Sequence, residues 1–486
     1  MYYRSARVSG LGNGEADSKP TGGTGGAGNA QRKSLAEVHE SVRVPGSDAG
    51  FWKQWKAFTG PAILVSVGYM DPGNWGTDLQ GGAQFKYGLL WVVGLASLMA
   101  IFLQVLAARL GVVTGRDLAQ CSREWYPRWT RAPNWLFCEV AIIATDLAEA
   151  LGSAVAINLL FHIPIMWALI ITAFDVLFLL ALQKVGMRLM EAIVTMLVAT
   201  IAGCYFIEIF ILPQTQPSFL EMARSLISPS LAQDGMLVMA IGIIGATVMP
   251  HNLYLHSALV QSRKFQKDPA SIRTAIKFNT LDSTLALTLA FFVNAAILVL
   301  AAIVFFDKTG VTLPGGETVS FSPDSDWITV AYLTLAPLIG TTLASTLYGV
   351  GLLASGQSST ITGTLAGQVV MEGFMQWRLR PEVRRVITRL LAIVPAIVIV
   401  GVRGNASVTD LVVLSQVALG LQLPFAMFPL LLFTSSRKRM GIWKSGPFLT
   451  LAGWGSAILI TCLDIYGLPD SLKAAWDVIA GAGGGG

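Results

Sequence analysis

Long apolar runs separated by short polar loops dominate the pattern of this 486-residue chain. A helix needs about 20 predominantly apolar residues to cross the hydrocarbon core of a bilayer. Many of the runs reach that length. We therefore predict an all-α integral membrane protein with about eleven transmembrane helices, at residues 58–81, 88–113, 133–158, 163–183, 189–212, 235–262, 278–306, 328–358, 386–402, 408–434 and 446–468.

Composition supports this class. Hydrophobic residues make up 53% of the chain and charged residues only 13%, whereas soluble domains average about 25% charged residues. The four cysteines are scattered and show neither metal-ligand nor disulfide spacing. HExxH, GxSxG and P-loop motifs are absent from the sequence, so we do not expect an enzyme.

Lys and Arg are unevenly distributed between alternate loops, which predicts the orientation. Cytoplasmic loops carry the excess of these residues in multi-spanning proteins. If the N-terminus is cytoplasmic, the outer side holds only Lys86, Arg224, Lys308, Arg403 and Lys473. We therefore expect a plasma (inner) membrane protein with its N-terminus in the cytoplasm and its C-terminus outside. The net charge of +5 then reflects topology, and no nucleic-acid partner is expected.

The chain divides into five segments. Residues 1–50 are Gly-rich and polar without an apolar leader, which predicts a disordered cytoplasmic tail rather than a signal peptide. Residues 51–212 hold spans one to five, and residues 235–434 hold spans six to ten. Span eleven, at 446–468, and a C-terminal tail, at 469–486, follow.

Two spans contain a proline-centred polar break. The first is Tyr-Met-Asp-Pro-Gly-Asn-Trp at 69–75, and the second is Gly-Ala-Thr-Val-Met-Pro-His-Asn at 245–252. The breaks lie in spans one and six, at matching places in two five-span halves. Interrupted helices at corresponding positions are the best sequence indication of a transporter binding site.

The prolines predict which groups the breaks expose. Proline cannot donate an amide hydrogen bond, so Pro72 frees the carbonyl of Gly68 and Pro250 frees that of Ala246. The residue before a proline is pushed out of the helical conformation. Asp71 and Met249 occupy those two positions.

Each feature alone has an ordinary explanation: a kink for proline, a buried ion pair for Asp71, packing for Met249. Together, in matched helices, they indicate a cation site, because an intramembrane Asp is costly and is by default functional. Asp71 and Asn74 offer oxygen donors, Ala246 a carbonyl and Met249 a thioether. Thioether sulfur favours transition metals over Mg²⁺ or Ca²⁺. The set predicts Mn²⁺ or Fe²⁺, with Cd²⁺ accepted as a mimic.

The motifs at 71–74 (Asp-Pro-Gly-Asn) and 246–251 (Ala-Thr-Val-Met-Pro-His) resemble the two metal-site signatures of the Nramp family. Further matches lie at 145–149, 352–360 and 421–426. The resemblance implies a LeuT-like fold in which spans one to five and six to ten are inverted repeats. It also implies proton-coupled import of Mn²⁺ or Fe²⁺. The implied metal ligands are Asp71, Asn74, the Ala246 carbonyl and Met249, with Gln416 approaching in an occluded state. A divergent branch that carries Mg²⁺ lacks the methionine, so Met249 argues against that branch.

Span three carries Glu139, Asp146 and Glu149 at offsets of seven and three, which places them on one helical face. A buried acidic stripe can relay protons; the alternative is a hydrated or salt-bridged structural face. Arg389 on span nine is a candidate partner, although Arg384 and Arg385 leave the choice open. The family resemblance implies proton handling for this stripe and for His251, Arg263 and Arg389.

We expect a secondary active transporter with no cofactor and no obligate protein partner. Its substrates would be a divalent metal ion and protons, within the lipid bilayer. A Na⁺-coupled amino-acid carrier of the same fold would not need Asp71 together with Met249. A membrane-embedded sensor would normally add a large soluble domain.

Overall fold

The computed structural model describes residues 33–46, 48–183, 186–211, 217–313, 316, 318–322, 325–339, 342–377, 379–404 and 407–480. From Lys33 onward the chain forms one compact unit. Within the described residues the strands are limited to two short pairs. β1 (Val42–Arg43) runs parallel to β2 (Arg263–Lys264), and β3 (Gly310–Thr312) runs antiparallel to β4 (Thr318–Ser320).

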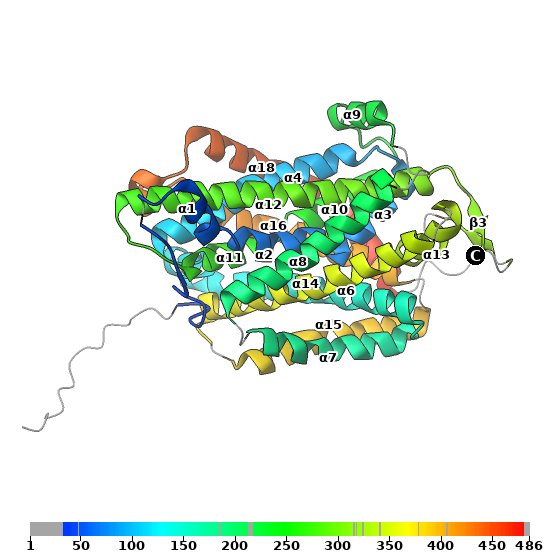
Figure 1. Ribbon diagram of the computed structural model, residues 1–486, viewed down its shortest axis with the longest axis horizontal. Helices are drawn as coiled ribbons and strands as arrows, with labels where there is room; N and C mark the ends of the chain where they lie inside the picture. The colour runs from blue at the N-terminus through cyan, green and yellow to red at the C-terminus, as the bar shows by residue number, and fades with distance from the viewer. Residues whose placement is uncertain are drawn as a thin grey trace, which may run out of the picture. The chain divides into compact units, whose positions relative to one another are not determined.

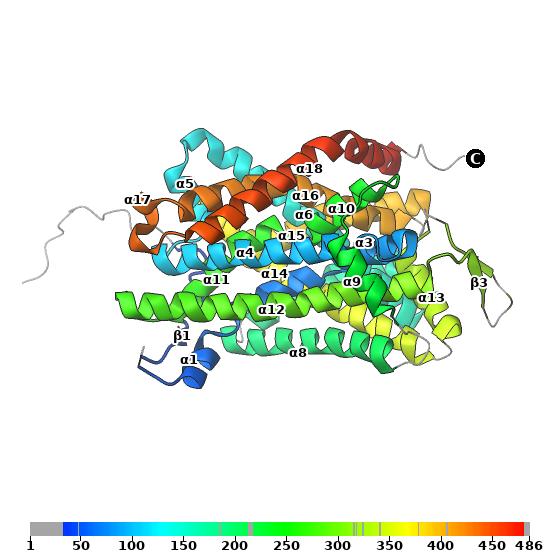
Figure 2. The same cartoon turned by 90° about the horizontal axis from the view of Figure 1, so that it is seen from above.

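Helices account for nearly all the remaining structure. Figures 1 and 2 show the longest of them lying side by side with similar axes. In the described part of the chain, eight segments are long and apolar enough to cross a membrane. The long helices are α4 (Leu90–Thr114), α6 (Arg131–Phe161), α7 (Ile165–Gln183), α8 (Met187–Phe206), α12 (Pro269–Val304), α14 (Thr342–Met375), α15 (Pro381–Arg403), α16 (Ser407–Thr434) and α18 (Pro447–Ala480).

Shorter helices form the two broken spans and the connections. The broken spans are α2 (Pro61–Ser66) with η1 (Val67–Met70) and α3 (Pro72–Phe85), and α10 (Met236–Thr247) with α11 (Pro250–Leu259). A short η4 (Val260–Ser262) joins α11 to β2. The connecting helices are α1 (Phe51–Phe58), α5 (Leu118–Trp125), α9 (Phe219–Ile227), α13 (Trp327–Ile339) and α17 (Arg437–Met440).

The prediction for span eight was wrong in its bounds. Residues 328–358 were expected to form one helix, but α13 ends at Ile339 and α14 runs from Thr342 to Met375. The second half of α14 is rich in Ser, Thr and Gly, which hides it from a hydropathy pattern. Those residues face protein rather than lipid: a Cβ atom added to Gly373 would lie 2.5 Å from Ala119 Cβ on α5. Small residues allow this close helix approach.

The terminal tails also differ from the expectation where the structure describes them. Residues 33–46 were expected to be disordered, but Leu35 is 1% exposed and Val42 is 7% exposed. They are held because Leu35 enters the core and β1 pairs with β2. At the other end, α18 continues beyond residue 468 to Ala480. Residues 1–32, 47 and 481–486 of the expected tails lie outside the described residues.

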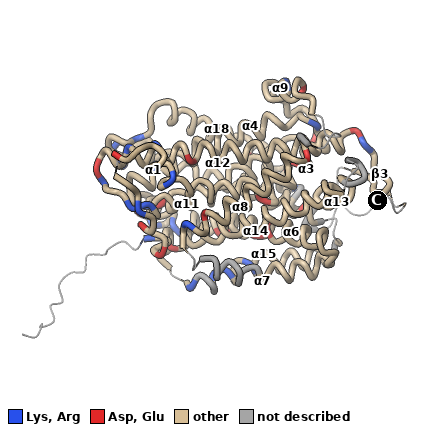
Figure 3. Tube along the Cα trace, in the orientation of Figure 1, with Lys and Arg blue, Asp and Glu red and all other residues tan. Residues whose placement is uncertain are grey.

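Charged residues avoid the middle of the long helices. Figure 3 shows that Lys and Arg gather mainly at the end of the helices that carries α1. The interior is closely packed, and its buried residues come from every long helix. The few charged side chains buried there therefore stand out as candidates for function.

Candidate metal-binding site

The first break holds Asp71 in an extended conformation between η1 and α3. Its backbone angles are φ −73° and ψ 170°, and it caps the N-terminus of α3. Asp71 Oδ1 accepts hydrogen bonds from the backbone N–H of Asn74, at 2.9 Å, and from Asn74 Nδ2, at 2.8 Å. The prediction that Pro72 forces Asp71 out of the helix is confirmed.

The second break has the same construction. Met249 is extended, with φ −64° and ψ 121°, and Pro250 begins α11. The preceding helix α10 ends at Thr247. The non-helical position of Met249 is likewise confirmed, and both breaks place a potential metal ligand directly before a proline.

The two breaks meet. Asn74 Nδ2 donates a hydrogen bond to the carbonyl oxygen of Ala246 over 3.1 Å. A Cβ on Gly68, in the first break, would lie 3.3 Å from Met249 Sδ and 2.3 Å from Asn252 Nδ2. The absence of a side chain at Gly68 therefore lets η1 lie directly against the start of α11.

Gln416 on α16 approaches the first break from a third helix. A Cβ on Gly73 would lie only 2.2 Å from Gln416 Nε2, so a larger residue at 73 would displace this amide. Gln416 is fully buried, as are Asp71, Asn74, Ala246 and Met249. The structure thus brings together all five residues proposed from the sequence as metal ligands.

Two oxygen atoms in this group accept no hydrogen bond from any residue that the structure describes. They are Asp71 Oδ2 and Gln416 Oε1, both buried. Buried polar atoms are nearly always partnered, and an unpartnered carboxylate oxygen is costly in a low-dielectric interior. A carboxylate, a backbone carbonyl, side-chain amides and a thioether can together hold a divalent transition metal ion.

Side chains that the sequence analysis missed support the break. Asn294 on α12 donates through Nδ2 to the Tyr69 carbonyl, at 2.8 Å, and to Asn74 Oδ1, at 3.1 Å. Ser355 on α14 donates to the Met70 carbonyl at 2.6 Å. These bonds satisfy main-chain oxygens that the helix break leaves open. A single polar residue in a long apolar run is the signal that could have found Asn294.

The acidic stripe of α6 is only partly paired. Glu139 accepts two hydrogen bonds from Arg384 Nη2, at 3.1 and 3.0 Å. Further along, a Cβ on Gly363 of α14 would lie 3.4 Å from Glu149 Oε1 and 3.7 Å from Asp146 Oδ1. These two carboxylates therefore share one buried region against α14. Within the described part of the chain, neither oxygen of Glu149 accepts a hydrogen bond, which distinguishes it from Glu139.

The arginines predicted to take part in the proton route lie in different parts of the structure. Arg389 donates to the Asp146 carbonyl at 3.3 Å and to the Thr172 carbonyl, so it contacts the stripe through main chain. Arg384 forms the ion pair with Glu139. His251 lies in the first turn of α11, where its Nδ1 makes no hydrogen bond with the described residues.

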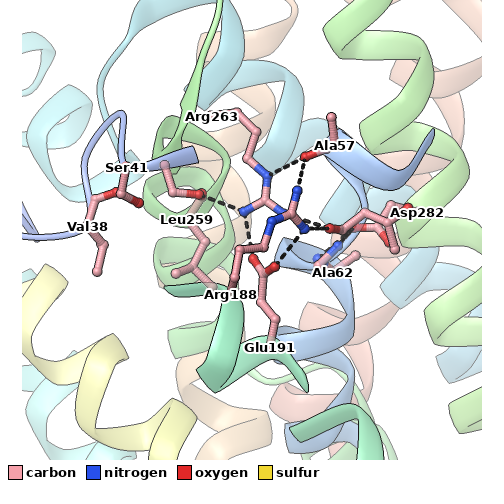
Figure 4. A network of polar contacts seen from close by, with 12 residues as sticks. Val38, Ser41, Ala57, Ala62, Arg188, Glu191, Leu259, Arg263 and Asp282 are labelled. Atoms are coloured by element: carbon pink, nitrogen blue, oxygen red, sulfur yellow. Dashed lines mark hydrogen bonds and ion pairs between the residues drawn. The ribbon is translucent and has the colours of Figure 1, made fainter. Parts of the chain in front are cut away.

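Arg263 belongs to a polar network that holds the start of α2 (Figure 4). Its Nη1 pairs with Glu191 Oε1 at 2.6 Å, and its side chain donates to the Ala57 and Thr59 carbonyls. Arg188 binds the same glutamate and also contacts the Lys56 and Ala57 carbonyls.

Asp282 on α12 completes this network. Its Oδ2 accepts from the backbone N–H groups of Gly60, at 3.2 Å, and Ala62, at 3.0 Å. A carboxylate at a helix N-terminus is favoured because the first N–H groups of a helix have no internal partners. Side chains from three other elements therefore fix the beginning of α2.

Comparison with known proteins shows the family of this chain. Residues 62–470 match the family model described as natural resistance-associated macrophage protein-like, or Nramp. The chain is 51% identical over 443 residues to a divalent metal cation transporter, MntH, of Nostoc sp., covering 91% of this chain and 97% of the relative. It is 46% identical over 435 residues to the MntH of Listeria innocua, covering 89% and 94%.

Solved structures of a manganese transporter also match this chain. The crystal structure of the Eremococcus coleocola manganese transporter, in complex with an aromatic bis-isothiourea substituted compound, matches with a TM-score of 0.80 and 37% identity over 92% of this chain and 96% of that chain. A crystal structure of a mutant of the same transporter matches with a TM-score of 0.80 and 38% identity over the same shares of the two chains. The chain therefore belongs to the Nramp family, and it is a membrane transporter with the LeuT-like fold rather than an enzyme.

Proposed function

We propose that this protein imports divalent transition metal ions, Mn²⁺ or Fe²⁺ and also Cd²⁺, coupled to protons. One observation carries the proposal. Two broken helices meet in the interior, where a carboxylate, a carbonyl, two amides and a thioether come together, and no described residue donates a hydrogen bond to the buried Asp71 Oδ2. The names of the relatives, which are divalent metal cation and manganese transporters, support this substrate class.

The metal would take over bonds that Asn74 makes in the described arrangement. Asn74 Nδ2 donates to the Asp71 carboxylate and to the Ala246 carbonyl, which are the same oxygens that a cation needs. Binding would therefore exchange one hydrogen bond to a carboxylate and one to a carbonyl for coordination, and the Asn74 amide would turn to present Oδ1. A cation also neutralises the Asp71 carboxylate, which is the larger electrostatic gain in a site of low dielectric constant.

The described arrangement is occluded. Asp71 and Met249 are fully buried, and Gln416 lies against Gly73 on one side of the metal ligands. On the other side, the network around Arg263, Glu191 and Asp282 fixes the start of α2. Gly60 precedes α2 with φ +136°, a backbone angle available to glycine, and is suited to act as its hinge. Release of the metal on that side requires α2 to leave this network.

Protons would pass along the stripe on α6. This helix adjoins the metal ligands, because a Cβ on Gly152 would lie 2.2 Å from Pro72 Cβ. Glu149 lies one turn away from Gly152, and Asp146 follows on the same face. Asp71 must be deprotonated to bind a metal, so metal binding releases a proton close to Glu149. Arg384 and Arg389 supply positive charge beside this route. His251 lies next to the proposed ligands in the first turn of α11, and Arg263 belongs to the network at the start of α2.

The distribution of Lys and Arg supports a plasma (inner) membrane location with a cytoplasmic N-terminus. The end of the helices that carries α1 and the Arg263 network would then be the inner side. This orientation makes separation of α2 from Arg263 the step that opens the site to the cytoplasm.

Purified protein in proteoliposomes tests the whole proposal. Mn²⁺ applied outside should accumulate inside, and a pH dye trapped in the lumen should report acidification in the same experiment. The Na⁺-coupled carrier alternative would show uptake of an amino acid that depends on Na⁺ and no metal flux. Metal uptake without any lumenal pH change would remove proton coupling and leave the metal site in place.

A further inference from the structure

Residues 33–46 form a strap that lies across several helices at the end of the molecule carrying α1. One end of the strap is anchored on α14. Leu35 is 1% exposed, and its backbone N–H donates to Glu372 Oε2 at 3.1 Å. Gln368 Nε2 donates to Glu37 Oε1 at 2.8 Å. These contacts bury both main chain and side chain of the strap against the same helix.

The other end of the strap is joined to the segment that follows α11. Glu40 N–H donates to the Gln261 carbonyl at 3.0 Å, and Val44 N–H donates to the Lys264 carbonyl at 3.2 Å. Between them, β1 pairs in parallel with β2, with Val42 opposite Arg263. The strap thus connects α14 to the end of the second broken span.

Arg263 connects the strap to α2. Its main chain belongs to β2 and pairs with β1, while its side chain holds the Ala57 and Thr59 carbonyls and Glu191. Figure 4 shows Val38 and Ser41 of the strap beside this network. Movement of β2 away from the strap would therefore also move the group that fixes the start of α2.

The strap joins a helix of a broken span to a continuous helix. α11 is half of a broken span that carries Met249, whereas α14 is a continuous helix packed on α6. In transporters of this architecture, alternating access moves one group of helices against another around a fixed site. Because the strap is hydrogen-bonded both to α14 and to the segment after α11, it opposes their separation. Some of these hydrogen bonds must break before the two groups of helices can move apart.

We propose that residues 33–46 are a gating strap, which stabilises closure of the α1 end of the molecule and detaches when that side opens. The proposal goes beyond metal import, because it concerns the equilibrium between two conformations whatever ion is carried. It assigns a conformational role to a segment that precedes the first span and lies apart from the metal ligands.

Cysteine accessibility tests this role without any metal. The four native cysteines are replaced, and single reporters are introduced as Ala62→Cys in α2 or Thr77→Cys in α3. Both positions are buried in the described arrangement, Ala62 at the start of α2 and Thr77 where α3 meets Gly242 of α10. A small thiol-reactive methanethiosulfonate reagent is added to full-length protein, and the modification rate is measured at each position.

The strap is disrupted by Leu35→Asp and compared with two controls, Leu35→Met and deletion of residues 1–32. With Leu35→Asp, modification at position 62 should rise by roughly tenfold, since burial of a leucine contributes strongly to the closed state. Modification at position 77 should fall, because a population shift toward opening at one side closes the other. Both controls should leave both rates within about twofold of the parent.

Two results would overturn the proposal. Unchanged modification at position 62 in Leu35→Asp would mean that the strap does not stabilise closure. A rise at both positions would show general loosening of the fold, because a gating role changes the two rates in opposite directions. Neither result bears on the proposed metal site, since no step of the measurement requires Mn²⁺.

Discussion

Asn74 on α3 donates a hydrogen bond to the carbonyl oxygen of Ala246 on α10, across 3.1 Å and between residues 172 positions apart in the sequence. This contact joins the two broken helices at the point where each lacks regular helical hydrogen bonds. The same Asn74 side chain binds Asp71, so one amide connects the charged ligand of the first break with the main-chain ligand of the second. A cation that replaces the two hydrogen bonds of this amide would therefore act on both broken helices at once.

Asn294 should affect metal affinity although it is not among the proposed ligands. Asn294→Ala removes the hydrogen bonds to Asn74 Oδ1 and to the Tyr69 carbonyl. The bond to the Tyr69 carbonyl supports the first break whether or not Asn74 turns toward a metal, and its loss is worth about 1 kcal/mol, so the apparent affinity for Mn²⁺ should fall by about fivefold. Uptake measured over a range of Mn²⁺ concentrations checks this. An unchanged concentration dependence would mean that Asn294 only fills space.

Met249 should act mainly on selectivity, because specificity is a difference between affinities. Met249→Ala removes the thioether and leaves space for a water ligand. Cd²⁺ uptake should fall by about tenfold or more, and Mn²⁺ uptake should fall less, because sulfur favours soft ions. Ca²⁺ or Mg²⁺ in excess should begin to compete with Mn²⁺. Full Cd²⁺ transport by a mutant that still ignores Ca²⁺ and Mg²⁺ would assign Met249 to packing.

Glu149 should be required for proton movement more than for metal binding. Glu149→Gln keeps the size of the side chain and removes its proton acceptor. The structural cost should be small, because no described residue donates a hydrogen bond to either Glu149 oxygen. Lumenal acidification per metal ion transported should drop severalfold, while Mn²⁺ binding to purified protein should change little.

Glu139→Gln is the matched comparison, because Glu139 on the same helix is paired with Arg384. That change leaves a buried arginine without its carboxylate and should lower the thermal stability of the protein. If Glu149→Gln left the proton flux intact, the acidic stripe would be a structural feature and the proton would take another route.

The sequence predicts the backbone conformations of the two proposed ligands Asp71 and Met249 well, because proline acts locally. Pro72 and Pro250 fix the extended conformations of Asp71 and Met249 from neighbouring positions, and such effects can be predicted without tertiary information. The approach of Gln416 to Gly73 is different, because no local pattern indicates which residue of α16 lies against α3. It was expected only through the family resemblance.

Other features depend on contacts between distant segments. Arg384 and Arg389 both fit the charge pattern of α15, and only packing decides that Arg384 pairs with Glu139. Polar composition concealed the second half of α14, since Ser, Thr and Gly there are buried by protein instead of lipid. Leu35 is a single leucine next to a Gly-rich tail, so no local pattern predicts its burial. It is held in place by contacts with distant segments, through its own bond to Glu372 and through the pairing of β1 with β2.

Direct Mn²⁺ binding to purified wild-type protein and to Asp71→Ala, measured by titration calorimetry with uptake in parallel, tests the central claim. Asp71 is the one charged group among the proposed ligands, and a divalent ion is not stabilised in a buried site by neutral groups alone. We expect saturable binding and uptake for the wild type, and loss of both for Asp71→Ala in protein that remains folded. Binding and uptake by Asp71→Ala close to the wild-type values would contradict the account and place the metal site elsewhere in the protein.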